Sequence, residues 1–222
     1  MKAARAIFFD AVGTLIRLPR GAAYHYVEVA ARHGADLPIE AVEAAFRAAW
    51  GELPPPRETR APRPDDDRGW WRDLVGRVLD RCAVPPGELD REAYFAELYS
   101  EFVQPGVWAV YPETEPVLAA LVERFQLGII SNFDGRLRAV LAQLGLAPFF
   151  QHVIISSEVG ADKPAPRIFE EALRRAGVRA AEAWHVGDEP ECDWEGGARA
   201  GLNVFKLQRP QNSLHDFVAA LV

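Results

Sequence analysis

Cysteine and long apolar stretches are scarce in this 222-residue sequence, and each scarcity excludes a class of protein. The two cysteines, Cys82 and Cys192, are too few for a disulfide framework and are expected to be free thiols in a reducing compartment. Asp10 interrupts the apolar run near the amino terminus, and neither a signal-peptide core nor a membrane span is expected. We therefore predict a cytoplasmic protein.

Positive charge is also in short supply. The 25 lysines and arginines stand against 32 aspartates and glutamates, which gives a net charge of -7. A negative protein is repelled by phosphate backbones and by anionic lipid, so we expect neither a nucleic-acid partner nor a membrane partner. The hydrophobic content of 49% is ample for a buried core, and a compact globular protein is expected.

Short apolar runs alternate with amphipathic helical patterns from Val110 onward, which is typical of a parallel sheet covered by helices. A further apolar run, Ile7–Phe9, precedes Asp10 and adds a first strand. The sequence thus predicts a doubly wound, Rossmann-like α/β core. The later predicted strands are Leu127–Ser131, His152–Ser156, Ala183–Asp188 and Asn203–Leu207, and the clearest helices start at Asp134 and span Pro166–Ala176.

The pattern changes between the first strand and residue 109, where helical stretches follow one another without a good strand. We expect residues 1–16 and 109–222 to form the α/β core, and residues 17–108 to form an inserted α-helical cap over the carboxyl edge of the sheet. Within this insert, Pro54–Asp67 is rich in proline and charge, which excludes a helix and indicates an exposed loop. The expected cap helices are Ala22–His33, Ile39–Trp50, Trp70–Cys82 and Arg91–Phe102.

Polar residues gather where the predicted strands end. Asp10 follows the first strand, Ser131 ends the second, Lys163 lies in a later loop, and Asp188 and Asp193 follow the strand at residues 183–188. A single strand-end aspartate is as often a helix cap or turn former as a catalytic group. The ordered set in one chain favours an active site at the carboxyl edge of the sheet.

Lysine is rare enough to carry information. The chain has 22 arginines but only three lysines, which are Lys2, Lys163 and Lys206. A lysine retained in a loop between a strand and a helix indicates a need for a compact ammonium that neutralises a carboxylate or a phosphoryl group. The alternative is a solvated surface lysine.

Three carboxylates near one ammonium require a further positive charge. Two such carboxylates about 4 Å apart repel by about 4 kcal/mol at an effective dielectric constant near 20. Mg²⁺ bound by carboxylates and substrate phosphate is a common solution. The alternative is that Asp188 and Asp193 are polar residues that flank a helix start and interact favourably with its dipole.

These segments, in this order, resemble the haloacid dehalogenase-like hydrolase superfamily with a helical cap inserted after the first strand. The resemblance implies that Asp10 is the nucleophile and that Ser131, Asn132 and Lys163 hold the phosphoryl group. It also implies a Mg²⁺ site made by Asp10, the backbone carbonyl of Val12 and Asp188, with Asp193 beside it. The implied activity is a phosphatase acting on a small phosphorylated metabolite through an aspartyl-phosphate.

Val12 departs from this pattern, because phosphatases of the superfamily carry a general-acid aspartate at the corresponding position. Such acid–base assistance contributes roughly 10²–10⁴ in rate, so a slow or specialised enzyme is expected. A metal-independent 2-haloacid dehalogenase is one alternative, since halide departure needs no proton. A catalytically weak protein that binds a phosphorylated ligand or a partner is another.

Five further residues are assigned structural roles. Trp70 and Trp71 are expected to anchor the packing of the cap helices, although one could line a substrate pocket. His25 could replace the missing acid, but an exposed helix histidine is favoured. His185 is expected in the core, and Cys192 as a small filler rather than a redox group.

Overall fold

The computed structural model describes residues 4–85 and 87–221, and the chain divides into two compact units. Unit 1 consists of Met1–Arg17, Arg57–Asp66 and Ala109–Val222, and unit 2 consists of Leu18–Pro56 and Asp67–Trp108. We call the segment Arg57–Asp66 the strap. It lies within the sequence of the expected cap but packs with unit 1.

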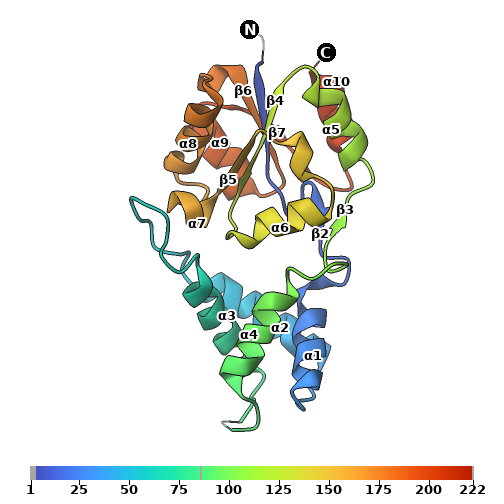
Figure 1. Cartoon of the computed structure of the whole chain (residues 1–222), viewed down its shortest axis with the longest axis vertical. Coiled ribbons are helices and arrows are strands. Elements are labelled where there is room, and N and C mark those ends of the chain that lie inside the picture. The colour runs from blue at the N-terminus through green and yellow to red at the C-terminus, as the bar shows by residue number, and fades with distance from the viewer. Residues whose placement is uncertain (1–3, 86, 222) are drawn as a thin grey trace. The chain divides into compact units, whose positions relative to one another are not determined.

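Unit 1 is built on a five-stranded parallel sheet with strand order β5-β4-β1-β6-β7 (Figure 1). The predicted doubly wound α/β fold is confirmed. The strands are β1 (Ala6–Phe9), β4 (Gln126–Ser131), β5 (His152–Ile155), β6 (Ala183–Gly187) and β7 (Asn203–Lys206). The helices of this unit are α5 (Thr114–Val122), α6 (Arg136–Gln143), α7 (Ser156–Val159), α8 (Pro166–Ala176), α9 (Gly196–Arg199) and α10 (Leu214–Ala220). Unit 1 also contains the 3₁₀ turns η1 (Ala147–Phe149) and η2 (Ala180–Glu182) and the π-helical segment η3 (Pro190–Glu195).

Successive residues of β1 serve opposite faces of the sheet, as the two-residue period of a strand requires. Phe8 packs in a cluster with Ile168 and Phe169 of α8. Phe9 makes an edge-to-face contact with Phe217 of α10, with ring centroids 6.1 Å apart. Because helices cover both faces of the sheet, every residue of β1 is buried and apolar. The end of β1 is therefore the first position at which a polar side chain is tolerated.

Two very short strands lie beside the boundaries between the units. β2 (Ile16–Arg17) pairs antiparallel with β3 (Ala109–Val110). No strand was expected here, because two-residue strands carry no readable hydrophobic alternation.

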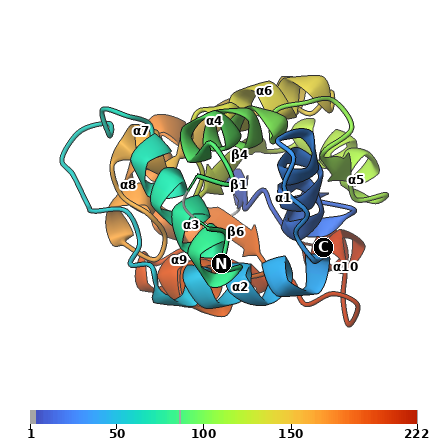
Figure 2. The same ribbon diagram turned by 90° about the horizontal axis from the view of Figure 1, so that it is seen from below.

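Unit 2 is formed by four helices, α1 (Gly21–Arg32), α2 (Ile39–Glu52), α3 (Arg68–Arg81) and α4 (Arg91–Glu101). The four helices expected from the sequence are confirmed within two residues at each end. Helix α2 packs against α1 and α3, and α4 packs against the same two helices (Figure 2). The helices share one apolar core, which contains Leu74 and Val78 of α3 and Phe95 of α4.

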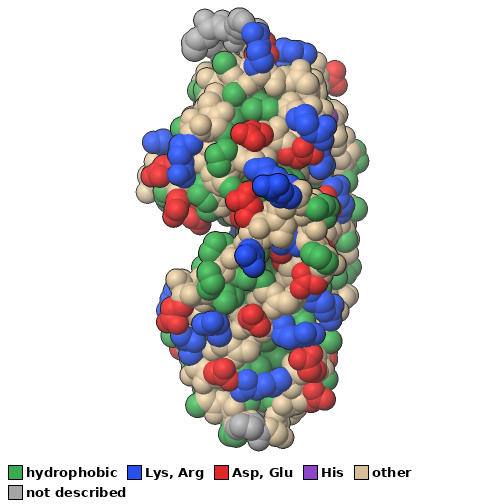
Figure 3. Space-filling view, turned by 90° about the vertical axis from the view of Figure 1, so that its left-hand side faces the viewer, with side chains coloured by type: hydrophobic (Ala, Val, Ile, Leu, Met, Phe, Trp, Pro, Cys, Tyr) green, Lys and Arg blue, Asp and Glu red, His purple; other side chains and the backbone are tan. Residues whose placement is uncertain are grey.

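The surface of the molecule carries charges of both signs. On the face drawn in Figure 3, acidic and basic side chains are interspersed. Among the described residues, none of the helices combines the length and apolar character needed to span a bilayer. Most residues of Pro54–Asp67 are exposed and none is helical, as expected, but Arg63 of the strap is only 8% exposed.

Candidate active site

Asp10 begins the site, directly after β1 at the carboxyl edge of the sheet. Its backbone N–H donates to the Val186 carbonyl of the neighbouring strand at 2.8 Å, and the residue is 7% exposed. Gly13 follows with a φ of +88°, and a Cβ there would overlap the Asp188 carboxylate. Glycine at this turn therefore lets the chain after β1 approach the chain after β6.

Lys163 lies between two of the predicted carboxylates. Its Nζ donates to Asp10 Oδ1 at 2.6 Å and to Asp193 Oδ1 at 2.7 Å, and the residue is 4% exposed. The ammonium is thus buried and held by two charge-assisted hydrogen bonds, which is where a point charge serves better than a guanidinium. The surface-lysine alternative is wrong.

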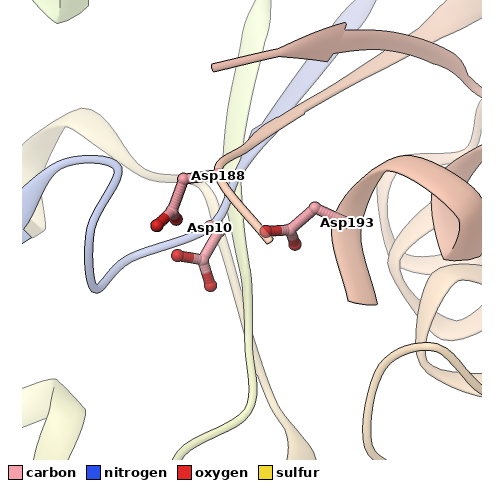
Figure 4. A group of neighbouring side chains, drawn as sticks. All are labelled: Asp10, Asp188 and Asp193. Atoms are coloured by element: carbon pink, nitrogen blue, oxygen red, sulfur yellow. The ribbon is translucent and has the colours of Figure 1, made fainter. Parts of the chain in front are cut away.

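The carboxylates of Asp10, Asp188 and Asp193 converge, and Figure 4 shows them turned toward one another beside the strand ends. Each offers an oxygen within 4.8 Å of the others. Asp188 also accepts a hydrogen bond from Thr14 Oγ1 at 3.0 Å. The ammonium of Lys163 bonds to two of these three carboxylates, and a divalent cation with a preference for oxygen ligands fits the donor set.

The titration of these groups reflects their crowding. Burial, together with repulsion from Asp193 and Asp188, raises the pKa of Asp10 to about 7 against the attraction of Lys163. Burial also raises the pKa of Asp188 above its ordinary value. Burial alone would raise the pKa of Asp193, but Lys163 and a hydrogen bond from His185 outweigh it and hold that pKa below the ordinary range. For Lys163, the two carboxylates outweigh burial and keep its pKa above normal.

Asp193 is committed to neighbouring donors. Its Oδ1 accepts from Lys163 and from His185 Nε2, the latter at 2.8 Å, and its Oδ2 accepts from the Glu189 backbone N–H at 3.0 Å. Burial lowers the pKa of His185, which favours the neutral imidazole with its proton on Nε2. His185 is a core residue as predicted, but it also orients a carboxylate of the site.

Ser131 and Asn132 come from the end of β4, the strand next to β1. Ser131 is 2% exposed, whereas Asn132 is exposed. The amide of Asn132 donates to the Lys163 carbonyl at 2.9 Å and accepts from the Lys163 N–H at 2.6 Å. This reciprocal pair joins the two loops, so Asn132 shapes the loop that carries the ammonium. Cys192 adds a thiol donor to the same Lys163 carbonyl at 3.4 Å.

Val12 is 37% exposed. The backbone bonds around it are made by Gly13 N–H to the Ile16 carbonyl at 2.8 Å and by Ile16 N–H to the Ala11 carbonyl at 3.0 Å. The Val12 carbonyl takes no part in either bond. The backbone hydrogen bonds of the described loops and turns include none donated by the N–H groups of Ala11 or Val12. Neither the Val12 carbonyl nor these two N–H groups are used in the backbone bonds of this turn.

Two residues that support the site were missed at the sequence level. Arg209 donates to the Thr14 carbonyl at 3.0 Å and to the Gly13 carbonyl at 3.4 Å, and it also pairs with Glu113. Thr14 in turn supports Asp188. The position of Thr14 directly after Gly13 could have indicated its contact with Asp188. Nothing in the sequence links Arg209 to a loop 195 residues away.

The cap residues considered above lie in unit 2 and pack there. His25 is 5% exposed and its Nδ1 lies 3.2 Å from Glu101, so the exposed helix histidine is wrong. Trp70 and Trp71 contact each other and Trp50, with ring centroids 4.9 to 6.0 Å apart. Their expected packing role is confirmed.

The fold and the site together define a class of enzyme. A family model described as haloacid dehalogenase-like hydrolase matches residues 4–201. The chain is also 36% identical over 207 residues to haloacid dehalogenase-like hydrolase domain-containing protein 3 of Mus musculus, which covers 90% of this chain and 80% of that protein. The chain belongs to the haloacid dehalogenase-like hydrolases and is a hydrolase of that superfamily.

Two further similar proteins are named for different chemistries. Over 101 residues the chain is 42% identical to a glyceraldehyde 3-phosphate phosphatase of Methanopyrus kandleri, covering 45% of this chain and 43% of that protein. The crystal structure of a 2-haloacid dehalogenase from Pseudomonas syringae matches with a TM-score of 0.64 and 25% identity, covering 95% of this chain and 88% of that one. Family membership therefore leaves the reaction to be decided from the site.

Proposed function

We propose that the protein is a Mg²⁺-dependent phosphohydrolase that transfers the phosphoryl group of a small phosphate ester to Asp10. One observation carries the proposal: the carboxylates of Asp10, Asp188 and Asp193 converge, and the buried ammonium of Lys163 bonds to Asp10 and Asp193. Three carboxylates against one lysine favour a bound cation and a phosphate ligand over a metal-free site. The similarity to a named phosphatase supports the same choice.

The residues present fit a magnesium ion. Asp10, Asp188 and the Val12 carbonyl supply hard oxygen ligands, and a magnesium ion there would offset carboxylate repulsion and polarise the phosphoryl oxygens. Asp193 shares its two oxygens among three donors. We therefore assign Asp193 to the support of Lys163 and place it outside the set of direct ligands.

The chain supplies the groups for two successive displacements. In the first, an Asp10 oxygen forms a bond to phosphorus while the bond to the leaving oxygen breaks, and the electron pair stays on that oxygen. Lys163, the Ser131 hydroxyl and the N–H groups of Ala11 and Val12 bind the phosphoryl oxygens. In the second, water attacks phosphorus, the bond to Asp10 breaks, and phosphate and the free carboxylate are released.

Val12 determines which esters react well. A valine donates no proton, so an alkyl leaving group departs as a poor, strongly basic alkoxide. An aryl leaving group is stable as the anion and needs no acid. We therefore expect faster cleavage of aryl phosphates than of sugar or other alkyl phosphates. Unit 2 is proposed to be the substrate-selecting cap.

A 2-haloacid dehalogenase is the second candidate. The absence of an acid at Val12 and the similarity to a 2-haloacid dehalogenase favour it. The cluster of carboxylates opposes it, because a haloacid brings a further carboxylate into a site that already holds three with one ammonium.

A substrate screen with and without Mg²⁺ separates the two candidates. We expect release of p-nitrophenol from p-nitrophenyl phosphate only with Mg²⁺, and no halide from 2-chloropropionate in either condition. The Asp188→Asn variant should also lose the rise in Tm that Mg²⁺ gives the wild type, because the ion binds the folded state. Halide release without added metal would instead establish the dehalogenase.

A further inference from the structure

The strap lies against the loops that carry the candidate phosphoryl-binding residues. In Figures 1 and 2 it runs beside α7, which directly precedes the loop of Lys163. Its chain enters from α2 and leaves into α3, both in unit 2. The strap thus connects two helices of unit 2, but it belongs to unit 1, which carries the candidate active site.

Backbone hydrogen bonds fix the path of the strap. Thr59 N–H donates to the Gly160 carbonyl and Arg63 N–H to the Ser157 carbonyl, both at 2.8 Å. Gly160 has a φ of +77°, and a Cβ there would overlap Thr59 Oγ1 and the Ala61 carbonyl. Glycine at this position both ends α7 and gives the strap room to dock closely.

Arg63 contacts the residue that directly precedes Lys163. Its side chain is 5% exposed, it pairs with the carboxylate of Asp162, and it donates to the Arg57 carbonyl at 3.2 Å. Asp162 immediately precedes Lys163 and its side chain is 13% exposed. A buried guanidinium is tolerated when it is paired, and removal of one partner leaves the other charge uncompensated. The ion pair thus fixes the residue next to Lys163.

Asp66 makes the corresponding contact on the loop that contains Asn132 and Gly135. Its carboxylate accepts from the Gly135 N–H at 2.9 and 3.1 Å and from the Ser157 hydroxyl at 2.5 Å. Asp66 and the following Asp67 adopt left-handed backbone conformations, with φ values of 52° and 60°. Such conformations are unfavourable for residues with a side chain and persist where surrounding contacts impose them.

These contacts bridge the same two loops that Asn132 and Lys163 already join directly. We propose that the strap is a positioning element, in which Arg63 and Asp66 hold the Lys163 loop and the Asn132 loop in register for phosphoryl binding. The direct amide pair forms one bridge and the strap forms the other. The expected effect on catalysis rests on the proposed phosphatase function. The restraint that the strap places on the two loops, which we call the clamp, does not.

Hydrogen exchange tests the clamp without any substrate. In Arg63→Gln and Asp66→Ala, amides in residues 131–137 and 157–163 are expected to exchange faster than in the wild type. Arg60→Gln is the matched control, because Arg60 is an exposed arginine of the same strap. Unchanged exchange at both loops in both variants would overturn the proposal.

Kinetics with p-nitrophenyl phosphate test the consequence. A small displacement of a binding group lowers rates strongly, so Arg63→Gln should lower kcat/KM roughly ten-fold, with partial recovery in Arg63→Lys. The rise in Tm with Mg²⁺ should stay at the wild-type value, because the metal ligands lie on other loops. A general loss of fold would lower the metal response as well.

The outcomes of the two experiments are separable. Faster exchange together with a lower kcat/KM and a normal Mg²⁺ response supports the strap as a positioning element. Faster exchange with an unchanged kcat/KM overturns it. If the wild type hydrolyses no phosphate ester, the phosphatase proposal fails, and the exchange data alone then decide whether the strap clamps the loops.

Discussion

The two units bury different kinds of side chain. In unit 1 the carboxyl edge of the sheet encloses Asp10, Lys163, His185 and Asp193, all less than 9% exposed. In unit 2 the interior is a cluster of aliphatic and aromatic residues, with His25 among the few buried polar side chains described there. Buried charge is unfavourable unless it is paired, so its concentration at one edge of unit 1 marks that edge as the candidate active site.

The same contrast separates the effects of substitution. Changes in the buried cluster of unit 1 should alter catalysis more than folding, whereas changes in the core of unit 2 should alter folding more than the chemical step. The variants below test this separation.

Asp10→Asn should have the largest effect. A carboxamide keeps the shape of the side chain but is a poor nucleophile, so hydrolysis of p-nitrophenyl phosphate should fall by more than about 10³-fold. Circular dichroism should show an intact fold. Activity close to the wild type would place the nucleophile elsewhere.

Leu74→Ala should give the largest effect in unit 2. Leu74 is fully buried in the core of that unit, and its truncation should lower the free energy of unfolding by about 2–5 kcal/mol. Urea titration followed by tryptophan fluorescence measures this, since Trp70 and Trp71 pack against the same core. An unchanged unfolding midpoint would contradict the assignment of Leu74 to the core.

Val12→Asp should raise activity. The side chain is partly exposed, so a carboxylate fits, and the backbone carbonyl stays available to a metal. The gain in kcat/KM on an alkyl phosphate should be roughly ten-fold or more, a fraction of the general acid–base contribution. The aryl substrate serves as the internal comparison and should gain less. A variant that binds Mg²⁺ normally yet gains nothing on the alkyl substrate would refute the role given to Val12.

Arg209→Gln should have the smallest effect of the four. It removes donors to the Gly13 and Thr14 carbonyls, each hydrogen bond contributing on the order of 1 kcal/mol. A drop of a few degrees in Tm and a few-fold loss of kcat/KM are expected. Arg199→Gln, at an exposed arginine of the same unit, is the control and should change neither quantity.

Hydrophobic periodicity and the residues at strand ends predicted the main strands, the helices of unit 2 and the grouping of the site residues. The apolar runs placed the five main strands of unit 1, and the 3.6-residue pattern placed the four helices of unit 2. Asp10, Lys163, Asp188 and Asp193 came together because parallel strands present their carboxyl ends at one edge. Rarity also helped, since lysine stood out in a chain that otherwise uses arginine.

Contacts between distant segments were not predictable. The composition of the strap is that of an exposed loop, and the burial of Arg63 depends on Asp162, which lies 99 residues further along the chain. The same applies to Arg209, whose carbonyl partners Gly13 and Thr14 come from the loop after β1. Local patterns report which face of an element is apolar, whereas such pairings depend on tertiary geometry.

Formation of the aspartyl-phosphate is the most direct test of the proposed phosphatase mechanism. Without an acid or base at Val12, breakdown of the aspartyl-phosphate should be slow while an aryl leaving group departs readily, so the phosphoenzyme should accumulate. Wild-type protein turning over p-nitrophenyl phosphate with Mg²⁺ is quenched in acid, digested and analysed by mass spectrometry. We predict one added phosphoryl group on the peptide that contains Asp10, and none when Mg²⁺ is chelated. Phosphate release with an unmodified Asp10 peptide, or with the group on another residue, would contradict it.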